Sequence, residues 1–292
     1  GTFRARLEGI KATSGSYLCT VDADDWVSED FANRLYRIAE DSGADVVECA
    51  LHYVRKERSK IKLKWAETSP ASAQGNDIVK GVLERKIWHI AANKIFRMSL
   101  VKTALPFLDK IQDKLVVADD KLLTFPFFYC AKSFVHIPDR LYFYRMRHDS
   151  ATNHRVIEND IRHIKNTQLI DKYIEEYLNN VRADDWLYKL ARLNRREEIL
   201  IALRNILIYE SGSNERQRLC AELLRNYDSE SLEVLLEAHE YVATVSNAGL
   251  ARYSRSDLMK IILHSIYRSL KAARVIIFPP CSIKKLNEES SR

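Results

Sequence analysis

The stretch Tyr17-Leu-Cys-Thr-Val-Asp22-Ala-Asp24-Asp25-Trp26 decides the fold class, because an apolar β-like run leads directly into three acids within four positions. Side chains alternate along a strand, which would place Asp22 and Asp24 on one face. Carboxylates this close repel one another unless a cation or hydrogen bonds offset the repulsion. Their oxygens suit Mg²⁺ or Mn²⁺, and ligands bind at strand ends in α/β sheets. The stretch therefore predicts a metal site at a strand end; the alternative is an Asp that caps the next helix beside solvated neighbours.

Strand-like and helix-like segments alternate on both sides of this stretch. Asp45–Cys49 and Ser133–Ile137 read as further short strands, residues 3–13 carry a helical pattern, and a helix is expected from Ser28 to Gly43. Strands interleaved with helices are typical of an α/β layered architecture.

The hydrophobic period changes in the second half of the chain. Apolar residues recur at helical spacing from Ile157, again over 186–209 and in three later segments. The sequence therefore predicts two domains: an α/β domain over 1–154 and an all-helical C-terminal domain or extension over 155–292.

Composition excludes several classes of protein. The 292 residues include 46 Lys plus Arg and 40 Asp plus Glu, a formal net charge of +6, with only 8 Gly and 6 Pro. These values exclude a collagen-like or wholly disordered chain. The five cysteines are scattered without any Cys-x-x-Cys pair, so neither a disulfide framework nor a zinc site is expected, and a reducing, cytoplasmic location is favoured. No run approaches about 18 consecutive apolar residues, so no membrane span is predicted.

Four stretches in order resemble one family. The first is Ala5-Arg6-Leu-Glu-Gly9-Ile10 followed by the acidic stretch, and the second is Trp88 to Arg97, with Ile90 and Ala91 widening the usual gap before Lys94. The others are Val117-Ala-Asp119-Asp120, with Asp where Glu is usual, and Leu141-Tyr-Phe-Tyr-Arg145-Met-Arg-His148-Asp-Ser. Together these stretches, which span residues 1–153, resemble the nucleotide-sugar-binding domain of family-two glycosyltransferases, which implies a GT-A fold with a partial Rossmann-like sheet.

The resemblance implies a metal-dependent, inverting transfer of a hexosyl group from a nucleotide-diphosphate sugar to a glycan or lipid-linked acceptor hydroxyl. It implies that Asp24 binds Mn²⁺ or Mg²⁺. Asp22 either binds the same metal or contacts the donor ribose, and Asp25 assists in binding the donor. Asp120 corresponds to the catalytic base, which takes the proton of the acceptor hydroxyl. From the residues alone, Asp120 reads equally well as a first-turn acid of a helix.

Three basic residues complete the implied site. Arg6 corresponds to the helix Arg that approaches the nucleotide, and Arg145 and His148 reach the donor diphosphate or the metal by the same resemblance. Each also reads as an ordinary solvated side chain, Arg6 on a helix face and the other two in a loop.

In this family the first strands, including those of the nucleobase pocket, precede the Ala-Arg-x-x-Gly helix with which this chain begins. The chain as given is therefore expected to lack most of that pocket, to bind a nucleotide sugar weakly by itself, and to be inactive without the missing strands. By analogy with the family, we expect a role in polysaccharide biosynthesis.

Residues 256–285 contain a basic amphipathic pattern in which Lys260, His264, Arg268 and Lys271 lie three to four positions apart. Two interpretations stay open: a helix that packs its apolar face on its neighbours, and a helix that lies on an anionic membrane surface, which would give a peripheral location at the inner face of the cell membrane.

Two other classes of function are alternatives to the enzyme. One is a non-catalytic, partner-binding module descended from a glycosyltransferase, which the expected missing strands favour and the intact acids oppose. The other is nucleic-acid binding, which is not expected because the sequence has no recognised motif and its basic residues are spread among acids.

Overall fold

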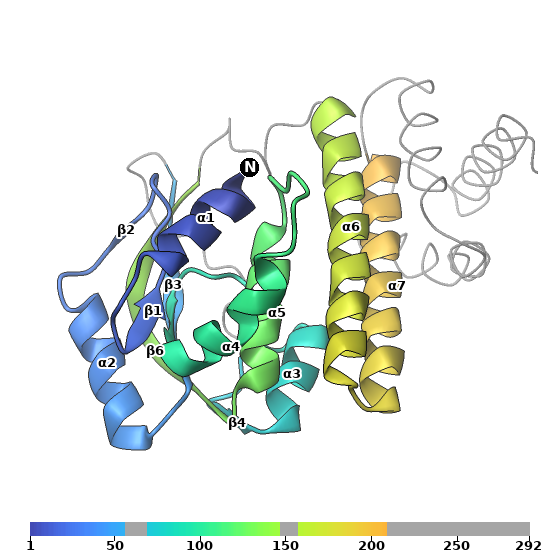
Figure 1. The fold of residues 1–292 in the computed structure, drawn as a ribbon. Helices are drawn as coiled ribbons and strands as arrows, with labels where there is room; N and C mark the ends of the chain where they lie inside the picture. Colours follow the sequence, from blue (N-terminus) through green and yellow to red (C-terminus); the bar gives the residue numbers. More distant parts are fainter. Residues whose placement is uncertain (56–68, 147–156, 209–292) are drawn as a thin grey trace, which may run out of the picture. The chain divides into compact units, whose positions relative to one another are not determined.

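The computed structural model describes residues 1–55, 69–146 and 157–208, and its first compact unit comprises Gly1–Arg195 (Figure 1). Its elements, in chain order, are α1 (Thr2–Lys11), β1 (Tyr17–Cys19), β2 (Trp26–Val27), α2 (Phe31–Ser42), β3 (Val46–Arg55), β4 (Ser72–Gln74), α3 (Asn76–Leu83), β5 (Lys94–Arg97), α4 (Met98–Leu108), α5 (Asp119–Cys130), β6 (Ser133–Met146), α6 (Ile157–Val181) and α7 (Asp185–Ile208). The predicted mixed α/β class is confirmed for the described residues.

The strands form one mixed sheet with the order β1-β5-β3-β6-β2, and β4 pairs with β6. β3 and β6 run parallel, whereas the other strand pairs of the described residues are antiparallel. Cys49 of β3 pairs with Ile137 of β6, but the next residue, Ala50, pairs with Arg140. The register of the β3–β6 pair therefore shifts after Cys49. The irregularity bends the long strand β6, whose end pairs with the short strand β2.

Helices cover both faces of the sheet, because successive strand side chains point to opposite sides. Val46 packs in a cluster with residues of α1, α3, α4 and α5, whereas the next residue, Val47, packs with Phe31, Leu35 and Ala39 of α2. Figure 1 shows α2 on one side of the sheet and α3, α4 and α5 on the other. The start of α5 thus lies on the same side as α1, which positions the site described below.

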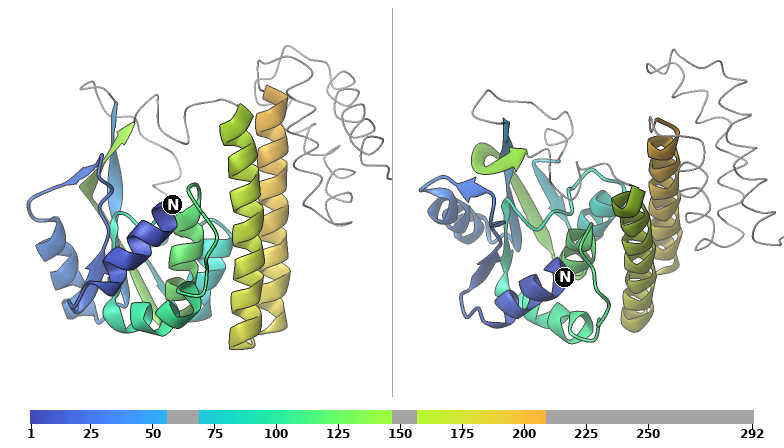
Figure 2. Two further views of the ribbon diagram at one scale, coloured as in Figure 1. Left: turned by 45° about the horizontal axis from the view of Figure 1, so that its top comes forward. Right: turned by 90° about the horizontal axis from the view of Figure 1, so that it is seen from above.

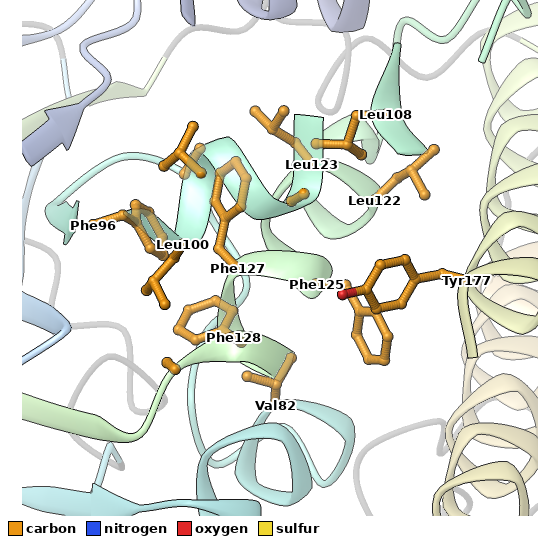
Figure 3. Close-up of a cluster of buried hydrophobic side chains, with 14 of the residues drawn as sticks. Val82, Phe96, Leu100, Leu108, Leu122, Leu123, Phe125, Phe127, Phe128 and Tyr177 are labelled. Carbon is orange, nitrogen blue, oxygen red and sulfur yellow. The ribbon is translucent and has the colours of Figure 1, made fainter. Parts of the chain in front are cut away.

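α6 packs against the outer side of α5 with apolar residues that are buried at helical spacing: Ile170, Ile174, Tyr177 and Leu178. The ring of Tyr177 meets that of Phe125 of α5 edge to face, with centroids 6.1 Å apart (Figure 3). α6 and the first part of α7 run side by side in both views of Figure 2. The predicted domain division at residue 154 falls between described segments and stays a prediction, although the chain up to Arg195 belongs to the same compact unit as the sheet.

Several predicted elements are confirmed, and one strand differs in a way that matters. α1, α2 and α6 lie where the helical patterns placed them, and Gly43 ends α2 with a φ of +67°. The expected strand over 17–21, however, ends at Cys19. β1 is an edge strand that pairs with β5 over three residues only. The acids therefore lie in a turn, so the expected shared strand face of Asp22 and Asp24 is wrong.

Some predictions fall on residues outside the described ones. These are the part of the last family stretch that contains His148, the three later helical patterns, and the basic amphipathic segment 256–285. Among the described helices, none is both long and apolar enough to cross a membrane.

Candidate active site

The acidic turn between β1 and β2 is held in place by β6. The amide N–H of Asp25 donates to the carbonyl of Asp22 at 3.0 Å, which closes the turn. The Tyr142 hydroxyl of β6 donates to Asp25 Oδ2 at 2.8 Å and accepts the amide N–H of Asp22 at 3.1 Å. Asp25 Oδ1 accepts the amide N–H of Arg145 at 2.8 Å. Both oxygens of Asp25 therefore bind the protein itself, and Tyr142 links the two ends of the turn.

The electrostatic surroundings of this turn differ from one acid to the next. Burial raises the pKa of Asp25, although the Arg145 amide and the Tyr142 hydroxyl act in the opposite direction. Asp24 is exposed, and the side chain of Asp22 is 36% exposed. Asp22 and Asp24 are thus the acids of this turn that an incoming cation reaches from solvent.

Arg6 of α1 joins the acidic turn to the start of α5. Its Nη2 donates to Asp22 Oδ1 at 2.7 Å, while Nη1 donates to Asp119 Oδ2 at 2.7 Å and to Asp120 Oδ1 at 2.5 Å. Burial by itself would lower the pKa of Arg6, but the three carboxylates raise it above its ordinary value. One guanidinium therefore brings together acids separated by about a hundred residues in the sequence, as the planar fork of Arg permits.

Asp119 and Asp120 occupy the first turn of α5, directly after a strained residue. Ala118 precedes the helix with a φ of +58° and a ψ of +13°, in the left-handed region that costs a non-glycine residue about 1 kcal/mol or more. Strain of this kind persists where the surrounding structure holds it, often at functional sites. The turn aims Asp119 and Asp120 at Arg6.

The pKa of Asp120 is well above that of an ordinary aspartate. Burial raises its pKa most, the Arg6 guanidinium opposes that shift, and the neighbouring acids Asp119 and Asp22 add to it, so that the pKa of Asp120 is about 6. The amide of Ala91 donates a hydrogen bond to this carboxyl group and lowers the pKa. Asp120 is therefore ionised at neutral pH yet basic enough to accept a proton, as a general base requires.

The segment that supplies the Ala91 amide is anchored to the sheet. Thr124 of α5 donates its hydroxyl to the carbonyl of His89 at 2.6 Å. At the other end, Asn93 adopts a φ of +56° and its side-chain amide donates to the carbonyl of Cys49. These contacts fix the segment at both ends and so keep the Ala91 amide beside Asp120.

Lys94 lies in the middle of the sheet. Its Nζ is 2.5 Å from Glu48 Oε2, and His136 Nδ1 is 3.0 Å from Glu48 Oε1, with both Lys94 and Glu48 almost completely buried. Burial would raise the pKa of Glu48, but Lys94 and His136 beside it lower that pKa below its ordinary value. Lys94 is thus part of an ion-pair row inside the sheet.

The structure brings some of the predicted residues together and leaves others apart. Arg6, Asp22 and Asp120 form one hydrogen-bonded cluster, and Asp25 binds β6. Arg145 contacts Asp25 through its backbone amide, and its exposed guanidinium lies 5.2 Å from the ring centroid of Trp26. His148 lies outside the described residues.

Three contributors were missed by the sequence reasoning: Tyr142, the Ala91 amide and Asp119 as a partner of Arg6. Tyr142 lies inside a family stretch and Asp119 is next to the predicted base, so the neighbouring sequence could have pointed to both residues. No residue type in the sequence marks a backbone amide such as that of Ala91 as part of a site.

The acids also bear on metal binding. Among the described residues, no group of three or more His, Cys, Asp or Glu side chains is arranged to hold a metal ion. Mg²⁺ and Mn²⁺, however, are commonly held by one or two carboxylates together with substrate phosphates. The accessible oxygens of Asp22 and Asp24 in one short turn fit that donor set.

Comparisons with known proteins relate the first part of the chain to one family. The profile of Glycosyl transferase family 2 matches residues 1–102. The putative glycosyltransferase EpsH of Bacillus subtilis (strain 168) is 24% identical over 147 residues, which are 50% of this chain and 42% of EpsH, so the chain spans about two fifths of that relative.

Solved structures of S. aureus TarS residues 1–349 are also similar. One covers 90% of this chain and 60% of its own, with 15% identity and a TM-score of 0.41; another, in complex with UDP-GlcNAc, covers 91% and 68%, with 16% identity and a TM-score of 0.43. The match over α1, the acidic turn and β5, together with the relationship to EpsH, shows that residues 1–102 are similar to glycosyl transferase family 2.

Proposed function

We propose that this chain carries the catalytic acids of a GT-A enzyme that transfers a hexosyl group from a nucleotide-diphosphate sugar to a hydroxyl of a glycan or lipid-linked acceptor. The observation that carries the proposal is Asp120, a largely buried carboxyl group with a pKa of about 6, joined through Arg6 to the acidic turn. The match of residues 1–102 to glycosyl transferase family 2 supports the class of reaction.

The proposed step is a single displacement that inverts the anomeric centre. Asp120 accepts the proton of the acceptor hydroxyl as its oxygen bonds to the anomeric carbon, and the bond from that carbon to the diphosphate breaks with its electron pair on the leaving group. A positioned base of this kind contributes roughly 10²- to 10⁴-fold to the rate.

The remaining acids and Arg6 support this step. Asp24 and Asp22 would hold Mn²⁺ or Mg²⁺, which supplies positive charge to stabilise the leaving diphosphate when bound. Arg6 orients Asp22 and Asp120 relative to each other, and Tyr142 holds Asp25 so that the turn keeps its shape. Contacts of Arg6, Asp25 and Arg145 with the donor stay predictions, as does any role of His148.

The setting of the reaction is also a proposal. Polysaccharide biosynthesis at the cytoplasmic face of the membrane accounts for a lipid-linked acceptor and for the basic pattern of residues 256–285.

The test is nucleoside diphosphate release in the full-length protein, supplied in turn with UDP-N-acetylglucosamine, UDP-glucose and GDP-mannose in the presence of Mn²⁺. Asp120→Asn should lower release at least 100-fold with donor binding unchanged, and Asp24→Asn should weaken the response to added Mn²⁺. With the native enzyme, release should rise with pH through about 6 and then level off, because Asp120 must be ionised to act as a base.

The matched control is Asp139→Asn, which removes an exposed acid paired with Arg34. Equal activities of Asp120→Asn and Asp139→Asn would contradict the assignment of the base. Absence of release with every donor, together with specific capture of a protein partner, would favour the non-catalytic module instead.

A further inference from the structure

Asn166 of α6 lies beside the segment that leads into the catalytic helix. Its side-chain Oδ1 accepts two consecutive backbone N–H groups, those of Val116 at 2.9 Å and Val117 at 3.2 Å. Asn166 is 7% exposed, and Val117 is buried with it. Buried amides need such partners, and here one side chain from a helix about fifty residues further along the chain satisfies both.

The position of these two amides decides where the acids point. Val117 is followed by Ala118, whose left-handed backbone begins α5, and the next two residues are Asp119 and Asp120. A change of conformation at Ala118 would rotate the first turn of α5 and carry both carboxylates away from Arg6. The contact from Asn166 therefore holds the chain immediately before Ala118, whose backbone is strained.

A second contact ties the other end of the same segment to the helices. Lys121 Nζ lies 2.9 Å from Asp171 Oδ1 of α6 and 2.9 Å from Asn194 Oδ1 of α7. Lys121 directly follows Asp120, so residues 116–121 are held at both ends by side chains of α6 and α7. Figure 1 shows α6 running along the side of α5, where these contacts arise.

We infer that Asn166 is a positioning residue for Asp120, which it holds in place through the Val116 and Val117 amides and the turn at Ala118. The inference rests on the proposed role of Asp120 and extends it to α6, a helix to which the sequence assigned no chemistry. Displacing a catalytic group by about 1 Å can cost 100-fold in rate, so a contact of this kind governs turnover without touching the substrate.

Asn166 accepts both amides through its side-chain oxygen, which makes a conservative rescue available. Asn166→Ala removes the acceptor, whereas Asn166→Asp keeps an oxygen that both amides can reach. The matched control is Asn179→Ala, because Asn179 also lies on α6 and its Oδ1 accepts one hydrogen bond, from the Tyr188 hydroxyl at 2.9 Å, away from residues 116–121.

The experiment places these variants in the full-length protein and follows UDP release from UDP-N-acetylglucosamine with Mn²⁺, together with amide hydrogen exchange of residues 116–121. Asn166→Ala should lower kcat about 10- to 100-fold with KM for the donor within twofold, and should speed exchange of the Val116 and Val117 amides at least tenfold. Asn166→Asp should stay within about threefold of the native kcat, and Asn179→Ala should match the native protein in both measurements.

Unchanged kcat per folded molecule in Asn166→Ala would overturn the inference, as would native exchange rates at Val116 and Val117. If Asn166→Ala fails to fold, the same measurements are made with Ala118→Gly present in all variants, since glycine relieves the strained turn. Failure of the proposed function has a separate signature, because Asp120→Asn would then leave UDP release unchanged while the exchange data still report on Asn166.

Discussion

Burial and neighbouring acids raise the pKa of Asp120 to about 6 against the opposing effect of one guanidinium. Burial and the charges of Asp119 and Asp22 disfavour the ionised carboxylate, and Arg6 compensates for only part of this effect. A carboxyl group whose pKa is raised in this way destabilises the folded protein at neutral pH, where it is ionised. Active sites commonly carry such perturbed groups, which links the chemistry of Asp120 to the stability of the chain.

Asp120→Asn should therefore stabilise the protein at alkaline pH. The pKa of Asp120 is about 6 in the folded state against an ordinary value of 3.8, so the folded protein binds this proton more tightly than the unfolded chain does. The resulting stabilisation is fully present below about pH 4 and is lost as the pH rises through 6. Because asparagine carries no charge, we expect the variant to gain about 1 to 3 kcal/mol at pH 8 relative to the native protein, and nothing at pH 4.

Urea unfolding at the two pH values measures this difference, with Asp139→Asn as the exposed control. A variant at position 120 that is less stable than the native protein at pH 8 would show that the bond to Arg6 outweighs burial.

Three neighbouring strands share one row of polar side chains in which Glu48 and Lys94 are buried. Glu48 of β3 is in register with Lys94 of β5 on one side and with His136 of β6 on the other, and it contacts both. The row spans the middle of the sheet, beside the segment that carries the Ala91 amide. Because water is excluded there, each charge depends on its partner for compensation.

Lys94→Met should consequently destabilise the protein by about 3 to 5 kcal/mol, since it leaves Glu48 buried without its cation. The double variant Lys94→Met with Glu48→Gln should recover part of this loss, because it removes the uncompensated charge. Urea unfolding checks both values. Lys86→Met, which breaks a pair with Glu84 in which the lysine is 65% exposed, should cost less than about 1 kcal/mol. Equal losses for Lys94→Met and Lys86→Met would contradict the role given to the row.

At the scale of the whole molecule, α6 packs on the helices that cover the sheet. The sheet, its covering helices, α6 and the start of α7 make up one compact unit that ends at Arg195. Ile170, Ile174 and Leu178 of α6 are at most 3% exposed and belong to the same buried cluster as α5. The helix that follows the α/β segment thus completes the core beside α5.

A chain that ends at residue 154 should therefore fail to fold stably. It would expose the outer face of α5 and lose the contacts of Asn166 and Lys121 with α6 and α7. We expect it to aggregate, or to bind a hydrophobic dye and unfold without a cooperative transition, as exposed apolar surface predicts. Light scattering, dye fluorescence and urea unfolding measure this against the full chain. Cooperative unfolding of the shortened chain at native stability would support the domain boundary predicted at residue 154.

The local sequence determined where several helices form and which acids are candidates for the site. Hydrophobic periodicity placed α1, α2 and α6, and Gly43 marked the end of α2, because these signals act within a few residues. The family stretches singled out Arg6 and Asp120 by their types and order. The tertiary structure alone decided the length of β1, the Arg6 bridge from Asp22 to Asp120, and the contacts of Tyr142 and Asn166. Each of these depends on groups brought together by packing from distant positions, and neither hydrophobic periodicity nor capping signals record such an approach.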